Sequence, residues 1–285
     1  MDDTRSTFAR ILVGVDGSAR AGEAARQAAL LAAAGGAELV LAHVIDTGHP
    51  HDTDDVEAEA EAVLERSAAL ARDVGVKPDV HLLAGSPATA LIDEARELGV
   101  DVICVGPDAG ALGGVVRIGR VAEHVMRDAG CSVMLGRTAG PSFPERILCG
   151  VDGSEASTRT AALAGSIAAT SGAELHLLHV VPVFRGRDAE WTLDEDEPSP
   201  PELEASVAAA TAQRVVPIRN MAMGRPEHAL VRAVEREHAD LLVVGHRGVK
   251  GVSRVVLGSV SEHCAKHAPC SVLVVRVAGS GGRSS

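Results

Sequence analysis

A repeat that runs through most of the chain constrains its fold more than any other feature. The stretch ILVGVDGS at 11–18 returns as ILCGVDGS at 147–154, which is 136 residues later. The stretch GAELVLAHVI at 36–45 returns as GAELHLLHVV at 172–181, at the same offset. The chain has 285 residues, the length of two ordinary domains. We therefore expect two tandem copies of one domain.

The two copies differ slightly in length. DVICVG at 101–106 matches DLLVVG at 240–245 at an offset of 139, so the second copy contains three extra residues. The stretch TAGPSFPE at 138–145 carries two prolines and forms the natural boundary. We place the first domain, or first half, at residues 1–139 and the second at 140–285.

Within each copy, apolar runs of strand length alternate with stretches of helix length. In the first copy we expect strands at 11–15, 39–45, 80–84, 102–105 and 132–135, and helices at 18–34, 56–74, 87–98 and 119–128. Strands that are apolar on both faces and separated by helices indicate a covered parallel sheet. The predicted fold class is α/β, with two tandem doubly wound units, each a five-stranded parallel sheet with helices on both faces. Such sheets bind ligands beyond the carboxyl ends of the strands, where the strand order reverses.

The composition excludes several classes of partner. Aromatic residues make up 1% of the chain and the formal net charge is −12, which argues against nucleic acid. No apolar stretch approaches 18 residues, so no membrane span is expected. The chain starts with an acidic segment rather than a signal peptide, and its five cysteines form no C-x-x-C pair. We expect a cytoplasmic protein whose cysteines act as small hydrophobic residues.

A cationic, glycine-rich loop connects a strand to a helix in the second copy. It reads GHRGVKGVSRVVLGS at 245–259 and contains Arg247, Lys250 and Arg254 but no acid. Glycines let backbone N–H groups approach a ligand closely, and a helix N-terminus attracts anions. The loop therefore favours an anion, most simply a phosphate. Neither a Walker A pattern nor a G-x-G-x-x-G fingerprint is present.

Three features together resemble the universal stress protein family, in its tandem two-domain form. They are a strand ending in VDGS, a second strand ending in His-Val, and G-x2-G-x9-G-[ST] before the last helix; the resemblance covers about residues 9–137 and 145–276. It implies that ATP, with or without Mg²⁺, lies across the crevice. By resemblance, the Asp contacts the ribose side, backbone after the second strand meets the adenine, and the loop holds the phosphates. The implied residues are Asp152, Val180, Gly245, Gly248, Gly258, Ser259 and Val260, with Asp16, Val44, Gly106 and Gly119 as counterparts in the first copy.

The first copy departs from this pattern. Ala109 replaces Gly248 and Arg120 replaces Ser259, and Asp108 lowers the loop charge to +1. We favour a degenerate copy that is retained for packing. The alternative is that Arg120 reaches a phosphate itself while other loop glycines build a different cradle.

Several of these residues also have ordinary structural explanations. Ser259 begins the pattern S-x-x-E at 259–262 and could cap its helix. Asp16 and Asp152 precede glycine and could be turn residues. His263 and His267 have the spacing of a zinc pair, but no third ligand follows at metal spacing, so we predict a surface helix and no metal. HPHDTDD at 49–55 is similarly expected to be a solvated loop.

The extra residues of the second copy fall between about 182 and 220. Here RGRDAEWTLDEDEPSPPE at 185–202 holds the only Trp, Trp191. We expect a surface connection, and a lid or docking role for Trp191 is a second hypothesis.

The sequence contains no recognisable hydrolase machinery. We predict a cytoplasmic ATP-binding regulator of the stress response, with nucleotide held mainly by the second domain. We expect no enzyme activity, or at most slow ATP hydrolysis. The alternatives are a nucleotide-free dimeric interaction scaffold and a slow ATPase. The apolar strands at 132–135 and 271–277 are expected at sheet edges, and the resemblance suggests that they pair between domains. The expected partners are an adenine nucleotide, an unknown protein target and a second copy of the chain, bound through these terminal edge strands.

Overall fold

The computed structural model describes residues 7–47, 53–107, 111–112, 115–116, 118–137, 140–182, 189–194, 197–246 and 257–276. The elements of the first half are β1 (Arg10–Gly14), α1 (Ala19–Gly35), β2 (Glu38–Ile45), α2 (Thr53–Asp73), β3 (Asp79–Ala84), α3 (Pro87–Leu98), β4 (Val102–Val105), β5 (Ala111–Leu112), β6 (Val115–Val116), α4 (Arg120–Asp128) and β7 (Ser132–Leu135). Those of the second half are β8 (Arg146–Val151), α5 (Glu155–Ser171), β9 (Glu174–Pro182), β10 (Ala189–Thr192), α6 (Pro201–Thr211), β11 (Ile218–Gly224), α7 (Pro226–Glu237), β12 (Leu241–Gly245), α8 (Ser259–His267) and β13 (Ser271–Val275).

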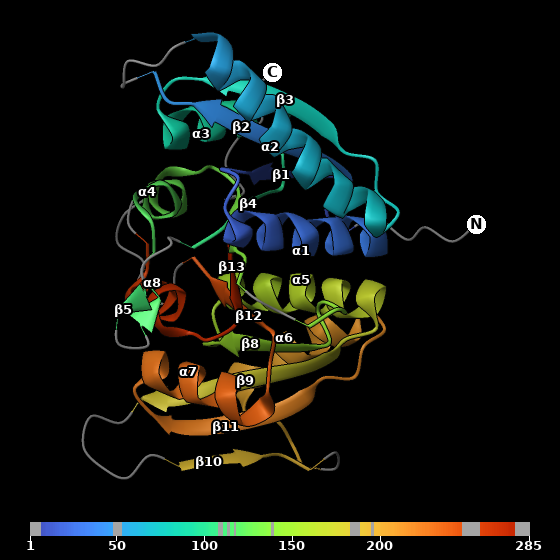
Figure 1. Ribbon diagram of the computed structural model, residues 1–285. Helices are drawn as coiled ribbons and strands as arrows, with labels where there is room; N and C mark the ends of the chain where they lie inside the picture. Colours follow the sequence, from blue (N-terminus) through green and yellow to red (C-terminus); the bar gives the residue numbers. More distant parts are fainter. Residues whose placement is uncertain are drawn as a thin grey trace, which may run out of the picture.

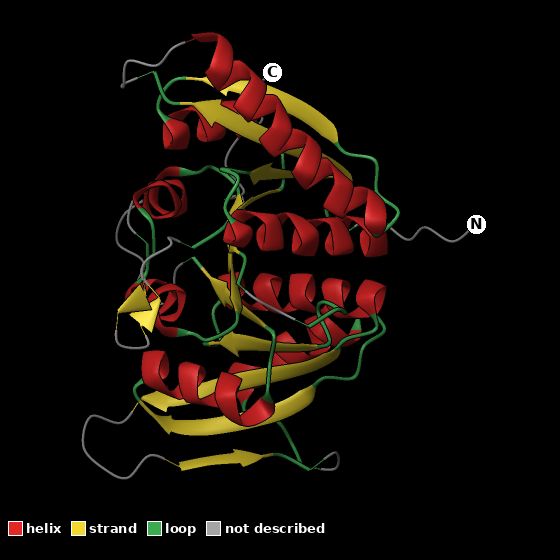
Figure 2. Cartoon of the chain, viewed as in Figure 1, coloured by secondary structure: helices red, strands yellow, loops and turns green. Residues whose placement is uncertain are grey.

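Each half contains the predicted five-stranded parallel sheet. The strand order is β3-β2-β1-β4-β7 in the first half and β11-β9-β8-β12-β13 in the second. In each half the chain adds strands first on one side of the half's first strand and then on the other. The points at which the strand order reverses, the switch points, therefore lie between β1 and β4 and between β8 and β12. The doubly wound α/β prediction is confirmed, and the helices and strands predicted for the first half are all present (Figure 2).

The two sheets join into one. β7 and β13 pair in the antiparallel direction, with Leu135 opposite Val272 and Val133 opposite Val274, giving a single sheet of eleven strands. The predicted pairing of the terminal strands between domains is confirmed. The expected homodimer through these strands is wrong for this arrangement, because β7 lies between β4 and β13 while β13 lies between β7 and β12. The outer edges of the sheet are β3 and β10.

Helices cover both faces of this sheet. One core contains residues of α1, α2, α5 and α6, and the other contains residues of α3, α4, α7 and α8. With few aromatic side chains, the cores are filled by Ala, Val, Leu and Ile, which allow close approach. A Cβ added to Gly136 would lie 2.7 Å from the backbone of Ala24, so α1 packs tightly beside the end of β7. Across the boundary, α1 contacts α5, and Figure 1 shows these two helices side by side.

Two arginines at equivalent positions connect the halves reciprocally. Arg137 follows β7 and donates to the carbonyls of Ala265 and Cys270, at the end of α8 and just beyond it. Arg276 follows β13 and donates to the carbonyls of Met126 and Arg127, at the end of α4. A cation at a helix C-terminus satisfies carbonyls that lack an intrahelical partner. Each half therefore stabilises the last helix of the other.

The acidic insertion contains an element that the sequence did not indicate. β10 pairs in the antiparallel direction with β11 at the outer edge of the sheet, with Trp191 opposite Met221 and 41% exposed. β10 lies three strands from β8, or about 14 Å at the usual strand spacing. Trp191 therefore lies away from the switch point, although β10 is only two strands from β9, which carries Val180. A lid role and a docking role for Trp191 both stay hypotheses.

No helix among the described residues combines the length and the apolar character needed to cross a membrane.

Candidate functional site

The predicted site residues of the second half lie at one edge of the sheet. Asp152 directly follows β8, and Gly245 ends β12, the neighbouring strand on the other side of the switch point. Val180 lies near the end of β9, which pairs with β8 up to Val151 opposite His179. The fold thus brings together residues that are 93 positions apart in the sequence, from Asp152 to Gly245.

The turn after β8 is held by the side chain of Asp152. Its Oδ1 accepts from the backbone N of Ser154 at 3.0 Å and from Ser154 Oγ at 2.6 Å. Gly153 adopts a φ of +80°, which favours glycine. Ser154 then caps α5 by accepting from the backbone N of Ser157 at 3.1 Å. The turn explanation of Asp152 is therefore correct, and any ligand contact would be a second role.

The first half repeats this turn. Asp16 Oδ1 accepts from the backbone N of Ser18 at 2.9 Å, and Ser18 Oγ accepts from the backbone N of Ala21 at 3.1 Å. Gly17 adopts a φ of +81°. Because the two turns agree this closely, the aspartate turn alone does not distinguish the halves.

A histidine on the second strand of each half fixes the end of the first strand. His179 Nδ1 lies 3.1 Å from the carbonyl oxygen of Val151, and His43 Nδ1 lies 2.7 Å from that of Val15. The residues after these histidines are Val180 and Val44, the two predicted neighbours of an adenine. Each therefore lies beside the turn that begins with its aspartate.

The glycine loop of the second half is closed at its base. The backbone N of Gly258 donates to the carbonyl of His246 at 3.0 Å, and Ser261 Oγ donates to the carbonyl of Gly245 at 2.6 Å. These bonds hold the start of α8 against the end of β12. The segment between them, residues 247–256, lies outside the described residues and includes Gly248 and the three loop cations.

Ser259 does not cap its helix. The N-cap of α8 is Gly258, with φ −63° and ψ 145°, and it makes no side-chain cap hydrogen bond. Ser259 is the first helical residue and is exposed, with Val260 following it in the first turn. The alternative explanation of Ser259 as a helix cap is therefore wrong. The first N–H groups of a helix lack intrahelical partners, so this end of α8 presents donors and a positive dipole.

The corresponding helix of the first half is held differently. α4 begins at Arg120 with Gly119 as its N-cap. Ala122 stands in the position of Ser261 and has no hydroxyl to hold the strand end. Between the described residues Gly119 and Pro107, the counterparts of Gly258 and His246, no backbone hydrogen bond is formed. Ala109 lies outside the described residues.

Gly106 has a structural reason to be glycine. A Cβ at this position would lie 3.0 Å from the backbone N of Ala21 and 3.1 Å from the carbonyl carbon and oxygen of Arg20, all of which belong to α1. The short strand β6 that follows contacts α8 of the other half. β6 therefore lies across the boundary, next to the helix that carries Ser259.

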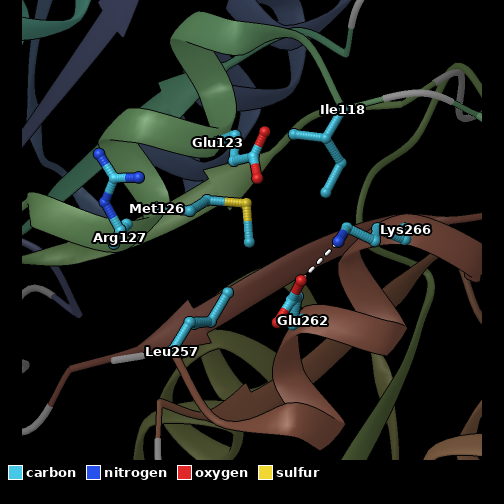
Figure 3. Close-up of a pocket in the computed structure, with 7 residues that line it drawn as sticks. All are labelled: Ile118, Glu123, Met126, Arg127, Leu257, Glu262 and Lys266. Carbon is cyan, nitrogen blue, oxygen red and sulfur yellow. Dashed lines mark hydrogen bonds and ion pairs between the residues drawn. The ribbon is translucent and has the colours of Figure 1, made fainter. Parts of the chain in front are cut away.

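Two pockets lie near these loops. The first, of about 160 Å³, lies between α4 and α8. Figure 3 shows its lining, with Glu262 and Lys266 forming an ion pair; the residues are Ile118, Glu123, Met126 and Arg127 of the first half, and Leu257, Glu262 and Lys266 of the second. The second pocket, of about 290 Å³, lies between α1 and α2 beside Gly17. The first pocket occupies the boundary between the halves rather than either switch point.

Metal-ligand sets and cysteine thiols are the remaining reactive groups of the described residues. Within the described ranges, no three His, Cys, Asp or Glu side chains are arranged to hold a metal ion. All five cysteines are free, and burial raises the pKa of Cys149 and Cys264 to about 12. Such thiols stay protonated at neutral pH, consistent with packing roles. Residues 49–52, most of HPHDTDD, lie outside the described residues.

The fold and the strand-end loops define a tandem, doubly wound α/β protein with a potential anion site where its strands end. The chain belongs to the universal stress protein family: the model of that family matches residues 7–137 and 144–276.

Related proteins of similar length support this membership. A universal stress protein of Mycolicibacterium smegmatis is 29% identical over 93% of this chain and 96% of its own. Universal stress protein Rv2005c of Mycobacterium tuberculosis is 27% identical over the same shares of the two chains. The crystal structure of a universal stress protein from Archaeoglobus fulgidus matches 95% of this chain and 98% of its own, with a TM-score of 0.75 at 23% identity. The last similarity supports the fold alone.

Sequence reasoning missed Ser261, which holds α8 to β12. Its signal was available, because the aligned residue of the first copy is Ala122 at the offset of 139. The two halves thus differ at Ser261 as they do at Ser259 and Gly248. The bond itself required the fold, since Ser261 and Gly245 are 16 residues apart.

Proposed function

We propose that this chain is a cytoplasmic, adenine-nucleotide-binding regulator of the stress response, and that its second half holds the nucleotide. One observation carries the proposal. Among the described residues, only the second half has two bonds, of Gly258 to His246 and of Ser261 to Gly245, that hold the N-terminus of α8 against the end of β12, and the sequence between these ends is cationic and rich in glycine. That arrangement provides backbone donors, a helix dipole and three cations for phosphate groups.

The proposed ligand is ATP, with or without Mg²⁺. Asp152 would contact the ribose side, and the backbone at Val180 would face the adenine. The phosphates would lie on the residues of the loop and the helix start, namely Gly245, Gly248, Gly258, Ser259 and Val260. These residues fit a phosphate group chemically, because glycines expose amides and Ser259 adds an exposed hydroxyl at a helix N-terminus.

The proposed role is binding rather than catalysis, with at most slow hydrolysis. The acid closest to the strand ends, Asp152, already accepts two hydrogen bonds from Ser154. General base catalysis requires a carboxylate that is positioned on the attacking water. The two hydrogen bonds in this turn direct Oδ1 of Asp152 to Ser154 instead. Steady ATP turnover that disappears in Asp152→Ala would contradict this view and favour the slow ATPase.

The first half is proposed to bind nucleotide weakly or not at all. Its equivalents Asp16, Val44, Gly106 and Gly119 keep their places at the strand ends, but Arg120 and Ala122 replace the two serines. We retain residues 1–139 and 140–285 as the proposed domains. A homodimer, which stays a prediction, would need another surface. The outer strand β3 is one candidate, since Val80 is 51% and Leu82 41% exposed.

The test is to denature the purified protein and to quantify the released nucleotide by chromatography. We expect about one adenine nucleotide per chain. Ser259→Arg, which copies the first half, should remove most of it, while Arg120→Ala should leave it unchanged. Two nucleotides per chain would show that the first half also binds. Release of none, together with no binding of added ATP, would overturn the proposal and favour the nucleotide-free scaffold.

A further inference from the structure

Three histidine rings meet between α7 and α8. The sequence pairs His263 with His267 on α8, and the fold adds His228 from the first turn of α7. The ring centroids of His228 and His263 lie 4.8 Å apart with an interplanar angle of 68°. Those of His263 and His267 lie 4.1 Å apart and are nearly parallel, at 18°. We call these three residues the histidine cluster. Its stacked rings do not form a metal site within the part of the chain that the structure describes.

The cluster lies beside the proposed phosphate end of α8. His263 and Ser259 are four residues apart, a spacing that brings helical side chains to about 6 Å from each other. A long side chain on a helix points back towards the N-terminus and covers the preceding turn. A phosphate bound at Ser259 would therefore lie about one helical turn from His263, on the side towards which its side chain is directed. His228 reaches the same place because α7, like α8, starts at the carboxyl edge of the sheet (Figure 1).

The charges around His263 favour its neutral form while no anion is present. Burial lowers the pKa of His263 first, and His267, His228 and Arg225 lower it further; Glu227 acts in the opposite direction. Arg225 and Glu227 form an ion pair at 2.8 Å, so they largely offset each other. A phosphate placed at Ser259 would supply the missing negative charge, and an opposite charge nearby favours protonation of an imidazole.

The first half lacks this cluster. Its counterpart of His263 is His124, but Thr89 stands in place of His228 and Asp128 in place of His267. His124 Nε2 pairs with Asp128 at 3.0 Å, so its nearest charged partner is an acid on its own helix. The cluster and the closed glycine loop therefore occur in the same half of the molecule.

We propose that His228 and His263 bind the outermost phosphate of the nucleotide held by the second half, and that one imidazole takes up a proton from solvent as the phosphate arrives. The inference rests on the proposed function and adds a specificity to it. The site would prefer a nucleoside triphosphate to a monophosphate, because only the longer chain extends past Ser259 along α8. It would also bind the triphosphate more tightly as the pH falls.

The experiment compares the full-length chain with the double variant His228→Thr, His263→Asn. The first change copies the residue of the other half, and the second keeps a polar side chain that does not titrate. ATP and AMP affinities are measured by calorimetry at pH 8 and pH 6, with a chelator present. The ratio of variant to wild-type Kd is used because the titration of ATP itself cancels in it.

For ATP we expect this ratio to rise by about tenfold from pH 8 to pH 6, the effect of one unit of pKa. For AMP it should stay near one at both pH values. Calorimetry in buffers of different ionisation enthalpy should show proton uptake with ATP in the wild type and less in the variant. His124→Asn is the matched control and should behave as the wild type. Melting curves should coincide at pH 8, since His228 is exposed and His263 is only partly buried.

A ratio for ATP that is the same at both pH values would overturn this inference while leaving nucleotide binding intact. So would an equal effect of the double variant on AMP. Absence of any nucleotide binding would overturn the proposed function as well. Tight binding of Zn²⁺ that is lost in the double variant would also overturn the inference, because it would make the cluster a metal site.

Discussion

At the scale of single residues, two aspartates perform the same structural task in the two halves. Asp16 and Asp152 each accept the backbone N–H of the serine two residues later, at 2.9 and 3.0 Å. Their turns are equivalent, but among the described residues only the second half, which contains Asp152, has a backbone hydrogen bond from the N-cap of the last helix to the residue after the neighbouring strand, from Gly258 to His246. This pair therefore allows the turn role to be separated from a ligand role.

We expect Asp152→Ala to weaken ATP binding by roughly 10- to 150-fold, the effect of losing a hydrogen bond to a charged group of about 1.5–3 kcal/mol. Asp16→Ala removes the same turn interaction and should leave ATP binding unchanged. Both variants should lose about 0.5–1.5 kcal/mol of unfolding free energy, because each turn loses a hydrogen bond. Calorimetric titration and urea unfolding measure the two effects. Equal losses of ATP affinity in both variants would show that the site is not confined to the second half.

At the scale of elements, the start of the last helix distinguishes the halves. α4 and α8 both begin with a glycine N-cap, at Gly119 and Gly258, and both follow a loop from the strand beyond the switch point. The difference lies in how the helix is held, since only α8 has a serine that reaches back to the strand end. A hydroxyl at this position connects the loop, the helix and the strand.

Restoring the second-half residues should therefore create a site in the first half. We expect Ala109→Gly with Arg120→Ser to raise the nucleotide content above that of the wild type, by up to one nucleotide per chain. Adding Ala122→Ser should increase it further, because it restores the donor that Ser261 provides. The released nucleotide is counted after denaturation. A content that stays unchanged in both variants would mean that the first half lost its site for another reason.

At the scale of the whole molecule, the halves share one sheet and exchange arginines. Arg137 is 5% exposed and burial lowers its pKa to about 10, so it is still charged at neutral pH. Its guanidinium holds carbonyls at the end of α8, and its backbone N donates to Ser271 Oγ at 2.9 Å. In the same way, the backbone N of Arg276 donates to Ser132 Oγ at 3.2 Å. The two halves are therefore expected to unfold together.

We expect Arg137→Ala to lower the free energy of unfolding by roughly 2–4 kcal/mol, because two buried carbonyls lose their donor. Arg276→Ala should cost less, since its side chain is only partly buried and water can replace the guanidinium. Guanidinium unfolding followed by circular dichroism would show a single transition for the wild type. Two separate transitions in the wild type, or no change in Arg137→Ala, would contradict this account.

The sequence by itself determined the repeat, the fold class and the five strands and four helices of the repeated unit, but not the short strands β5, β6 and β10. It could do so because hydrophobic periodicity and turn residues act over short distances, as in the VDGS turns and the Ala-rich helices. It also indicated the contrast between Ser259 and Arg120. The alternative that Ser259 caps its helix is wrong, since the S-x-x-E pattern does not reveal that Gly258 occupies the N-cap position.

The tertiary structure alone decided what meets across long separations. It joined β7 to β13, and thereby took away the edges through which a dimer was expected. It placed His228 against His263, 35 residues later in the chain, and Ser261 under Gly245. Such contacts depend on how helices pack on the sheet and on the close approach that small residues such as Gly136 allow. Local sequence patterns do not predict these contacts, because the residues come together only when the sheet has formed.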